Sequence, residues 1–164
     1  MFPQPEVVGE EFYSTARINV EGENFFEIAL KLHNHSSWPA RSGKDLAVRY
    51  YFSLEEMHSH QECSNKIKVS TNYNQGVAIS DVKPTHPSTS TYFIEADFSK
   101  ANLAPTGEGD SQKEIQFRVS IPNECGKNNL SNDWSNDQLV SFEFRKTPRI
   151  PVLERGQLIW GSHP

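Results

Sequence analysis

The sequence predicts an all-β fold, an antiparallel β-sandwich of jelly-roll type with about nine strands. Hydrophobic residues alternate with polar ones along several segments, as they do in half-buried strands. Gly, Pro, Asn and Ser punctuate the chain between these segments, and no segment has a convincing 3.6-residue hydrophobic period. Because a strand with one apolar face must bury that face against another layer, the strands are expected to form two packed sheets.

The clearest strand is residues 25–33, where Phe26, Ile28, Leu30 and Leu32 share one face. The same alternation, or a shorter run bounded by turn residues, predicts the other strands at 46–52, 67–71, 77–82, 92–98, 114–121, 139–145, 151–156 and 157–161.

Two of these segments need a further remark. In 139–145 the alternation turns Val140, Phe142 and Phe144 toward the core. The stretch 53–60, "SLEEMHSH", has room for one helical turn.

Length and charge limit the class of protein. With 164 residues, 35% of them hydrophobic and 11% aromatic, the chain is expected to bury one core and form one domain. A net charge of −5 argues against a nucleic-acid-binding surface. No apolar run is long enough to span a bilayer, and the start "MFPQPEVVGEEF" lacks the features of a signal peptide. We therefore expect residues 1–10 to be the remnant of a linker and residues 11–164 to be a monomeric module of a longer chain.

Catalytic motifs are poorly supported. His58 and His60 are two apart, as are His33 and His35, but a catalytic zinc needs a third ligand and an open position. The acids are scattered, with no sign of the defined carboxylate pair that glycoside hydrolysis requires. There is no Gly-x-Ser-x-Gly turn for a nucleophile. The chain is not expected to be an enzyme by itself.

Planar polar side chains lie on the strand faces that alternation turns away from the core. Arg49 and Tyr51 are one such pair, and Gln116 and Arg118 are another. We also assign Tyr92 and Glu95 to an outer face. Such side chains suit the hydroxyls and C–H faces of a sugar ring, although a solvated sheet surface explains them equally well.

Five stretches of the chain carry a family resemblance. In order they are "NHSSWPARSGKDLAVRYYFSLEE", "VSTNYNQGVAISDV", "EIQFRVSIP", "NLSNDWS" and "PVLERGQLIWGSHP". In order and spacing they resemble a family 3 carbohydrate-binding module, over roughly residues 11–164. "WPAR" resembles subgroup c, whose members lie downstream of family 9 glycoside hydrolase domains in bacterial cellulases. The resemblance implies a non-catalytic, secreted module that binds cellulose.

The resemblance also implies a structural calcium ion. Its ligands would come from a strand end and from the segment that contains Asp133, namely Ser53, Glu55, Asn129, Asn132 and Asp133. Two carboxylates with further amide and hydroxyl oxygens suit this hard cation. From spacing alone, an Asx-type turn without metal explains the Asn and Asp residues as well.

The resemblance implies weak binding to crystalline cellulose, because the family's flat aromatic strip is incomplete in this sequence. Tyr73 matches the strip, but its Asp-His pair falls around residues 62–64 and its tryptophan around Cys125. Trp38, Trp134 and Trp160 belong to other motifs. The implied role is to guide a single β-1,4-glucan chain into the adjacent catalytic domain and so support processive hydrolysis.

The expected contact residues lie in a shallow groove on the sheet opposite the strip: Arg49, Tyr51, Tyr92, Glu95, Gln116, Arg118 and Trp134. Pairing within a sheet, or contact with a catalytic domain, is an alternative use for each of them. Direct targeting of crystalline cellulose and a protein–protein or scaffold role in a cellulase complex are alternative functions.

Cys63 and Cys125 both map near the incomplete strip, so a disulfide is one possibility and two free thiols are the other.

Overall fold

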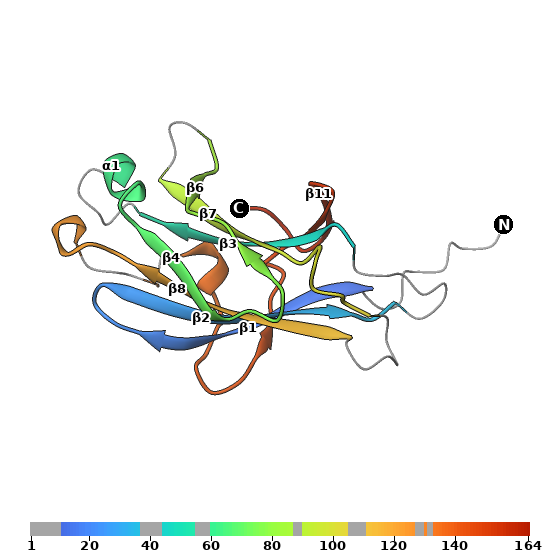
Figure 1. Cartoon of the computed structure of the whole chain (residues 1–164). Helices are drawn as coiled ribbons and strands as arrows, with labels where there is room; N and C mark the ends of the chain where they lie inside the picture. The colour runs from blue at the N-terminus through green and yellow to red at the C-terminus, as the bar shows by residue number, and fades with distance from the viewer. Residues whose placement is uncertain are drawn as a thin grey trace.

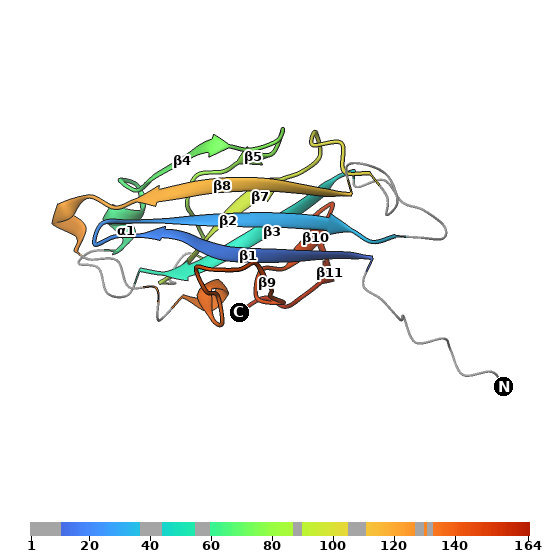
Figure 2. The same cartoon turned by 90° about the horizontal axis from the view of Figure 1, so that it is seen from below.

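Two antiparallel sheets stack face to face in a computed structural model that describes residues 11–36, 44–54, 60–86, 90–104, 111–126, 130 and 133–164 (Figure 1). The first sheet, sheet A, has the order β4-β8-β2-β1-β9. Its strands are β4 (Lys68–Tyr73), β8 (Gln112–Ser120), β2 (Phe25–Asn34), β1 (Phe12–Glu21) and β9 (Arg145–Lys146). Figure 2 looks onto this sheet, with β8, β2 and β1 running side by side.

The second sheet, sheet B, has the order β11-β10-β3-β7-β5, and β6 also pairs with β7. Its strands are β11 (Gln157–Trp160), β10 (Val152–Glu154), β3 (Leu46–Ser53), β7 (Thr91–Asp97), β5 (Ala78–Ile79) and β6 (Lys83–Pro84). The short helical segments are α1 (His60–Ser64), η1 (Asn123–Cys125) and η3 (Trp134–Asn136). The predicted antiparallel β-sandwich is confirmed.

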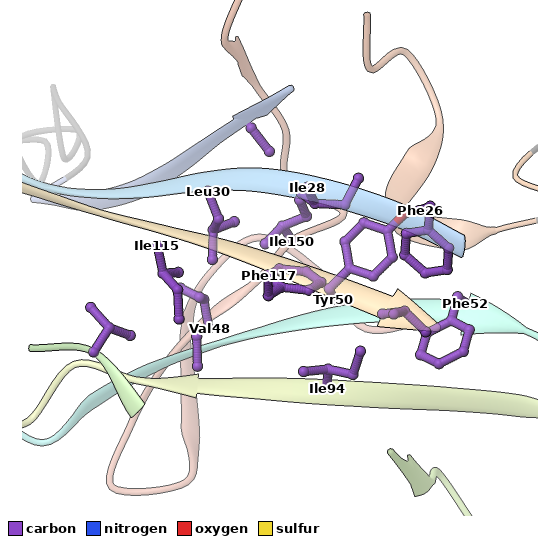
Figure 3. Packing of buried hydrophobic residues seen from close by; sticks show 14 of the residues in the cluster. Phe26, Ile28, Leu30, Val48, Tyr50, Phe52, Ile94, Ile115, Phe117 and Ile150 are labelled. Atoms are coloured by element: carbon purple, nitrogen blue, oxygen red, sulfur yellow. The ribbon is translucent and has the colours of Figure 1, made fainter. Parts of the chain in front are cut away.

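The core fills the space between the sheets, as alternation predicts. Phe26, Ile28 and Leu30 of β2 point across to Tyr50 and Phe52 of β3, and all five are at most 1% exposed (Figure 3). The rings of Phe26 and Phe52 meet edge to face with centroids 5.9 Å apart, a favourable arrangement for aromatic pairs. The faces turned away from this core are therefore the available surfaces of each sheet.

Strand β1 was not expected from the sequence. Its inward positions include the small residues Ser14 and Ala16, both fully buried, so it lacks a hydrophobic stripe. The Ser14 hydroxyl donates to the carbonyl of Ile150 at 2.7 Å, which satisfies a polar group inside the sandwich. Strand β1 pairs with β2 along almost its whole length. Pairing with β2, together with burial of Phe12, places β1 in the sheet.

The strand predicted at 139–145 is wrong. Only Arg145 and Lys146 form a strand in this region, and Phe142 is 74% exposed instead of buried. Phe144 lies on the outer face of sheet A beneath Lys31, whose Nζ is 4.0 Å from the ring centroid. The two phenylalanines of this segment therefore lie outside the core between the sheets.

Some predictions fall on residues that the structure does not describe. The helical turn expected within 53–60 falls mainly on residues 55–59, which lie outside the described residues, and the helix α1 begins at His60. The expected linker remnant, residues 1–10, and Trp38 also lie outside them. In the part of the chain that the structure describes, no helix has the length and apolarity to cross a membrane.

Candidate functional site

The two sheets separate the residues that the sequence analysis grouped into one groove. Arg49 and Glu95 lie on the outer face of sheet B, where β3 and β7 pair them directly. Gln116 and Arg118 lie on the outer face of sheet A, on β8. No single groove of this sandwich can contain all four.

Tyr92 is not a surface residue, which corrects the sequence assignment. It is 3% exposed and shares the inner face of β7 with Ile94 and Ala96, which are also buried. Strand periodicity of two puts Tyr92 and Glu95 on opposite faces, because they are three residues apart. Tyr92 therefore belongs to the core cluster.

The outer face of sheet A carries a row of side chains across four strands. The register pairs Tyr73 of β4 with Gln116 of β8, Gln116 with Ala29 of β2, and Ala29 with Arg17 of β1. Tyr73 is 46% exposed at one end of the row. The row therefore begins with an accessible aromatic ring and the polar Gln116, and it then reaches Ala29, which is fully buried.

Hydrogen bonds hold these polar side chains in place. The Gln116 amide donates to Glu114 Oε2 at 2.7 Å, and its carbonyl oxygen accepts from Asn19 at 3.3 Å. Asn19 also donates to Glu27, which pairs with Arg118 at 3.5 Å. A network of this kind fixes the side chains before a ligand arrives, which lowers the entropic cost of binding.

Next to this network the face is hollowed. A depression of about 350 Å³ is lined by Glu27, Arg118 and the β4 residues Ser70, Thr71 and Asn72. The Arg118 guanidinium lies over the ring of Phe25, 4.5 Å from its centroid. Its donors and the hydroxyls of β4 thus face the same depression.

Sheet B presents a second depression, of about 340 Å³. Arg49 pairs with Glu95 at 3.0 Å and stacks over Phe93, with its Cζ 4.4 Å from the ring centroid. Tyr51 is 2% exposed, and its hydroxyl is hydrogen-bonded to His163 Nδ1 at 2.8 Å. The Arg49 guanidinium and the Tyr51 hydroxyl, which the sequence analysis assigned to this groove, are thus already bonded to neighbouring side chains. His86 and His163, which also line it, were not expected, because nothing in the sequence brings either residue to β3.

The Arg49 guanidinium stays charged in this setting. Burial alone would lower its pKa, but hydrogen bonding to Tyr51 and Glu95 outweighs burial and raises the pKa above its ordinary value. Arg49 therefore acts as a fixed cation within sheet B.

The segment around Asp133 is attached to the end of β3. The Asp133 carboxylate is 5% exposed, and its Oδ1 accepts a hydrogen bond from the backbone N–H of Ser53 at 2.9 Å. Ser135 Oγ accepts from the backbone N–H of Tyr51 at 2.7 Å and donates to the carbonyl of Arg149 at 2.6 Å. These bonds explain why an acid and a serine flank the tryptophan: both anchor η3 to β3.

Trp134 lies next to the sheet B surface. Its ring lies under the Arg149 guanidinium, with Cζ 4.0 Å from the centroid, and Arg149 also pairs with Asp137 at 3.6 Å. Trp134 lines a further depression with Ser53, Thr91 and Pro164, and the last two also line the depression on sheet B. Its ring is therefore a cation–π partner of Arg149 beside sheet B.

Burial, and secondarily the charge of Asp133, raise the pKa of Tyr50 well above its usual range.

The described residues at the expected calcium site fit a cation in part. Ser53 and Asp133 are adjacent, and a buried carboxylate at a strand end is the kind of ligand that calcium takes. Glu55, Asn129 and Asn132 lie outside the described residues. Among those that are described, no group of three or more His, Cys, Asp or Glu side chains is placed to hold a metal ion.

His33 and His35 make contacts with β1 residues. His33 stacks on Tyr13 with centroids 4.7 Å apart and is hydrogen-bonded to Thr15, while His35 is hydrogen-bonded to the Tyr13 hydroxyl. Burial, together with the nearby charges of His35, Lys31 and Lys146, lowers the pKa of His33 to about 4. His58 and the side chain of His60 lie outside the described residues.

Cys63 and Cys125 form a disulfide between α1 and η1, with their Cα atoms 5.9 Å apart. It lies where the resemblance places the Asp-His pair and the tryptophan of the aromatic strip. A covalent tie thus occupies positions that would otherwise carry strip residues.

Fold and surfaces together define a class, an all-β binding domain whose polar side chains lie on the outer faces of a two-sheet sandwich. The chain belongs to the cellulose binding domain family, carbohydrate-binding module family 3, whose family model matches residues 13–161.

Its relatives include endoglucanase A of Bacillus pumilus, 38% identical over 163 residues, which cover 99% of this chain and 25% of the relative. Endoglucanase B of Cellulomonas fimi is 29% identical, with 99% of this chain and 15% of the relative covered. The chain thus spans about a quarter or less of these two proteins.

Among solved structures, endoglucanase CelQ from Clostridium thermocellum, complexed with cellobiose and cellotriose, has a TM-score of 0.85 and 34% identity. The match covers 99% of this chain and 27% of CelQ. A module from the scaffoldin CipA of the same organism's cellulosome has a TM-score of 0.71 at 18% identity, which shows a shared fold. The match covers 94% of this chain and 92% of that module.

Proposed function

We propose that this module is the non-catalytic, subgroup c accessory module of a secreted family 9 endoglucanase, and that it guides a single β-1,4-glucan chain into the catalytic domain. It binds crystalline cellulose weakly. The relatives named as endoglucanases, of which this chain matches about a quarter, support the association with a hydrolase. The Cys63–Cys125 disulfide supports secretion, because such bonds persist in oxidising compartments.

One observation carries the single-chain role: the hydrogen-bonded polar row on the outer face of sheet A, which starts at Tyr73 and crosses Gln116. Amide, carboxylate and guanidinium groups suit the hydroxyls of a sugar, and Tyr73 offers one ring for stacking. Sheet B is the poorer candidate, because its ring Tyr51 is 2% exposed and bonded to His163, whereas Tyr73 of sheet A is 46% exposed.

Weak binding to crystalline cellulose follows from the same face. A flat crystal surface rewards several coplanar rings, each worth roughly 1 kcal/mol beyond its buried area. On the described part of sheet A, Tyr73 is an exposed ring, but Phe144 is covered by Lys31 and Trp134 lies under Arg149 at another place. Polar contacts without further stacking fit a loosened chain better than a crystal.

The test is binding of the isolated module to microcrystalline cellulose, phosphoric-acid-swollen cellulose and soluble cellohexaose. We expect binding to the swollen form and to the oligosaccharide to exceed binding to the crystalline form. Gln116→Ala should raise Kd about three- to tenfold, the loss of one or two hydrogen bonds. Arg49→Ala, a matched polar change on sheet B, should leave Kd unchanged.

Three other results would change the proposed function or the proposed binding face. Tight binding to the microcrystalline form would make the module a targeting anchor. A loss caused by Arg49→Ala but not by Gln116→Ala would move the sugar to sheet B. Absence of binding to every glucan would leave the scaffold or protein–protein role.

We further propose a structural calcium ion held by Asp133 and Ser53 together with Glu55, Asn129 and Asn132. The buried Asp133 carboxylate at the end of β3 supports this proposal. Bound calcium would supply positive charge between these oxygens and tie the segment before η3 to the strand end.

Metal analysis of protein purified without chelators should find about one calcium per chain. At a concentration one hundred times Kd the ion contributes about 2.7 kcal/mol, so EDTA should lower Tm by about 5 to 10 °C. In Asp133→Ala the EDTA effect should vanish, whereas Asp137→Ala, an exposed acid in the next turn, should retain it. Calcium-free native protein would refute the site.

A further inference from the structure

The last residue of β4, Tyr73, lies opposite Gln116 because the strand contains a bulge. Thr71 opposes Phe117 and Tyr73 opposes Gln116, so Asn72 is inserted between two consecutive positions of the β8 register. Side chains alternate between the two faces of a strand, and one inserted residue reverses this alternation. Without Asn72, the alternation would turn Tyr73 toward the core. The bulge therefore places this ring on the outer face of sheet A.

A hydroxyl group holds the bulge against β8. The Thr71 hydroxyl donates to the carbonyl of Gln116 at 2.8 Å, and the carbonyl of Tyr73 lies 3.2 Å from the same hydroxyl oxygen. A bulge interrupts the ladder of backbone hydrogen bonds between two strands. The hydroxyl thus supplies a donor at the point where the ladder is interrupted, and it keeps the backbone of Tyr73 close to β8.

The turn that follows Tyr73 leads from β4 of sheet A to β5 of sheet B (Figure 2). The backbone N–H of Val77 donates to the carbonyl of Asn74 at 2.8 Å, and the two residues between them, Gln75 and Gly76, have φ values of 45° and 86°. This is the pattern of a type I′ turn, whose central positions favour Asn, Asp and Gly. Glutamine is an unfavourable residue for the first of these positions, because a side chain in the left-handed region costs free energy.

The Gln75 side chain makes a contact that accounts for its presence. Its Oε1 accepts a hydrogen bond from the backbone N–H of Glu114 at 2.7 Å. Glu114 is the β8 residue whose carboxylate accepts from the Gln116 amide. An asparagine would suit the turn, but its side chain is one methylene shorter than the side chain that makes this contact. Gln75 therefore ties the turn after Tyr73 to β8.

We propose that Gln75 is a positioning residue for sugar binding, which acts by fixing the ring of Tyr73 on the outer face of sheet A. This inference rests on the proposed function, in which Tyr73 stacks on a glucan chain. Tyr73 is 46% exposed at the end of its strand, with the Thr71 hydrogen bond before it and the Gln75 hydrogen bond after it. A ring that is held in place before the ligand arrives loses less entropy on binding than a freely moving ring.

The crossing between the two sheets is the competing explanation for the turn. Val77 is buried in the core, and a Cβ on Gly76 would lie 3.3 Å from the Lys100 carbonyl oxygen, so the chain has to turn tightly here. The backbone hydrogen bond of the turn and the glycine meet this requirement. The hydrogen bond from Glu114 to the Gln75 side chain is the feature that the crossing does not need.

The test compares Gln75→Gly with the wild-type module. Glycine keeps the positive φ and removes the side chain that reaches Glu114. Kd for cellohexaose should rise about three- to tenfold, because the Tyr73 ring then has to be ordered on binding. The free energy of unfolding in urea should change little, since glycine also removes the cost of the left-handed conformation. Gln138→Gly, at a glutamine with a φ of 68° outside sheet A, is the matched control and should leave Kd unchanged.

A double-mutant cycle shows through which side chain Gln75 acts. In the Tyr73→Ala background, Gln75→Gly should have no further effect on Kd, because the ring that it positions is absent. In the Gln116→Ala background, Gln75→Gly should keep its full effect. Gln75→Glu keeps an oxygen that accepts from the Glu114 N–H and should keep the wild-type Kd. Deletion of Asn72 should abolish the nuclear Overhauser contacts between the Tyr73 ring and the sugar C–H protons.

An unchanged Kd in Gln75→Gly would overturn the inference, and so would a rise of the same size in the Tyr73→Ala background. Coupling to Gln116 in place of Tyr73 would also overturn it, because Gln75 would then act through Glu114. Failure of the proposed function is seen separately, as the absence of glucan binding by the wild-type module. The positioning is then measured in the sugar-free module, where nuclear Overhauser contacts between Tyr73 and Gln116 should weaken in Gln75→Gly, and unchanged contacts would contradict it.

Discussion

Breaking the Cys63–Cys125 disulfide should lower the stability of the module by about 4 kcal/mol. The bridge closes a loop with a sequence separation of 62 residues. In the chain-entropy description this separation corresponds to about 14 cal/mol/K, or about 4 kcal/mol at 25 °C, removed from the unfolded chain. At about 2 to 4 °C per kcal/mol for a domain of this size, Tm should fall by about 8 to 16 °C.

Three samples separate the contributions: the oxidised module, the module reduced with a phosphine, and the Cys63→Ala/Cys125→Ala double variant. Both cysteines are at most 5% exposed, so alanine avoids placing an unsatisfied hydroxyl in the interior. Urea unfolding gives the free energy of unfolding for each sample, and the m-value reports whether the unfolded chain expands when the bridge is absent.

The reduced module and the double variant should agree within about 1 kcal/mol and share a larger m-value than the oxidised module. A stability loss below about 1.5 kcal/mol, with an unchanged m-value, would refute the reasoning, because the bridge would then not restrict the unfolded chain.

Two further predictions concern single side chains. Ser135→Ala removes the oxygen that accepts from the Tyr51 N–H and donates to the Arg149 carbonyl, so the free energy of unfolding should fall by about 2 to 4 kcal/mol. Ser141→Ala, in an exposed loop, should change it by less than about 0.5 kcal/mol in the same urea titration. Burial lowers the pKa of His33 from 6.5 to about 4, so the folded state binds this proton only at a lower pH than the unfolded state does. Stability from this group is complete above pH 6.5 and is lost as pH falls toward 4; His33→Gln should flatten that part of a stability–pH curve.

The strand pattern could be predicted where large apolar residues alternate. Strands β2, β3 and β8 follow their predicted ranges because Phe, Ile, Leu and Val alternate with polar residues and face one core. Strand β1 escaped prediction because Ser14 and Ala16 take its inward positions. Whether a small side chain fits an inward position depends on the side chains of the opposing sheet. The sequence of the strand alone does not reveal those side chains.

The false strand at 139–145 has the opposite cause. Phe142 and Phe144 alternate like buried residues, yet Phe144 is stabilised by Arg17 and Lys31, which come from β1 and β2. Cation–π partners more than a hundred residues away cannot be read from the segment itself. Hydrophobic alternation therefore predicts a buried strand both where the alternating rings face the core and where they pack against cations on the outer surface.

The sequence predicted which residues of the candidate site face outward, but it did not predict which sheet each of them belongs to. Arg49, Glu95, Gln116 and Arg118 do face outward, as alternation indicates. Which sheet each strand joins depends on long-range pairing, so the sequence merged two faces into one groove. The resemblance predicted Ser53 and Asp133, 80 residues apart, as ligands of one calcium ion, and the structure brings them together by a hydrogen bond from the Ser53 N–H to the Asp133 carboxylate.

Burial limits the proposed sugar-binding row to one side of sheet A. The register continues from Tyr73 and Gln116 to Ala29 of β2 and Arg17 of β1, but Ala29 is fully buried. Arg17 Nε is also buried, and its guanidinium lies 4.8 Å from the centroid of Phe144. A glucan chain on this face would therefore contact β4 and β8 and not β1. The proposed single-chain role thus depends on Tyr73, on Gln116 and on the depression beside Arg118.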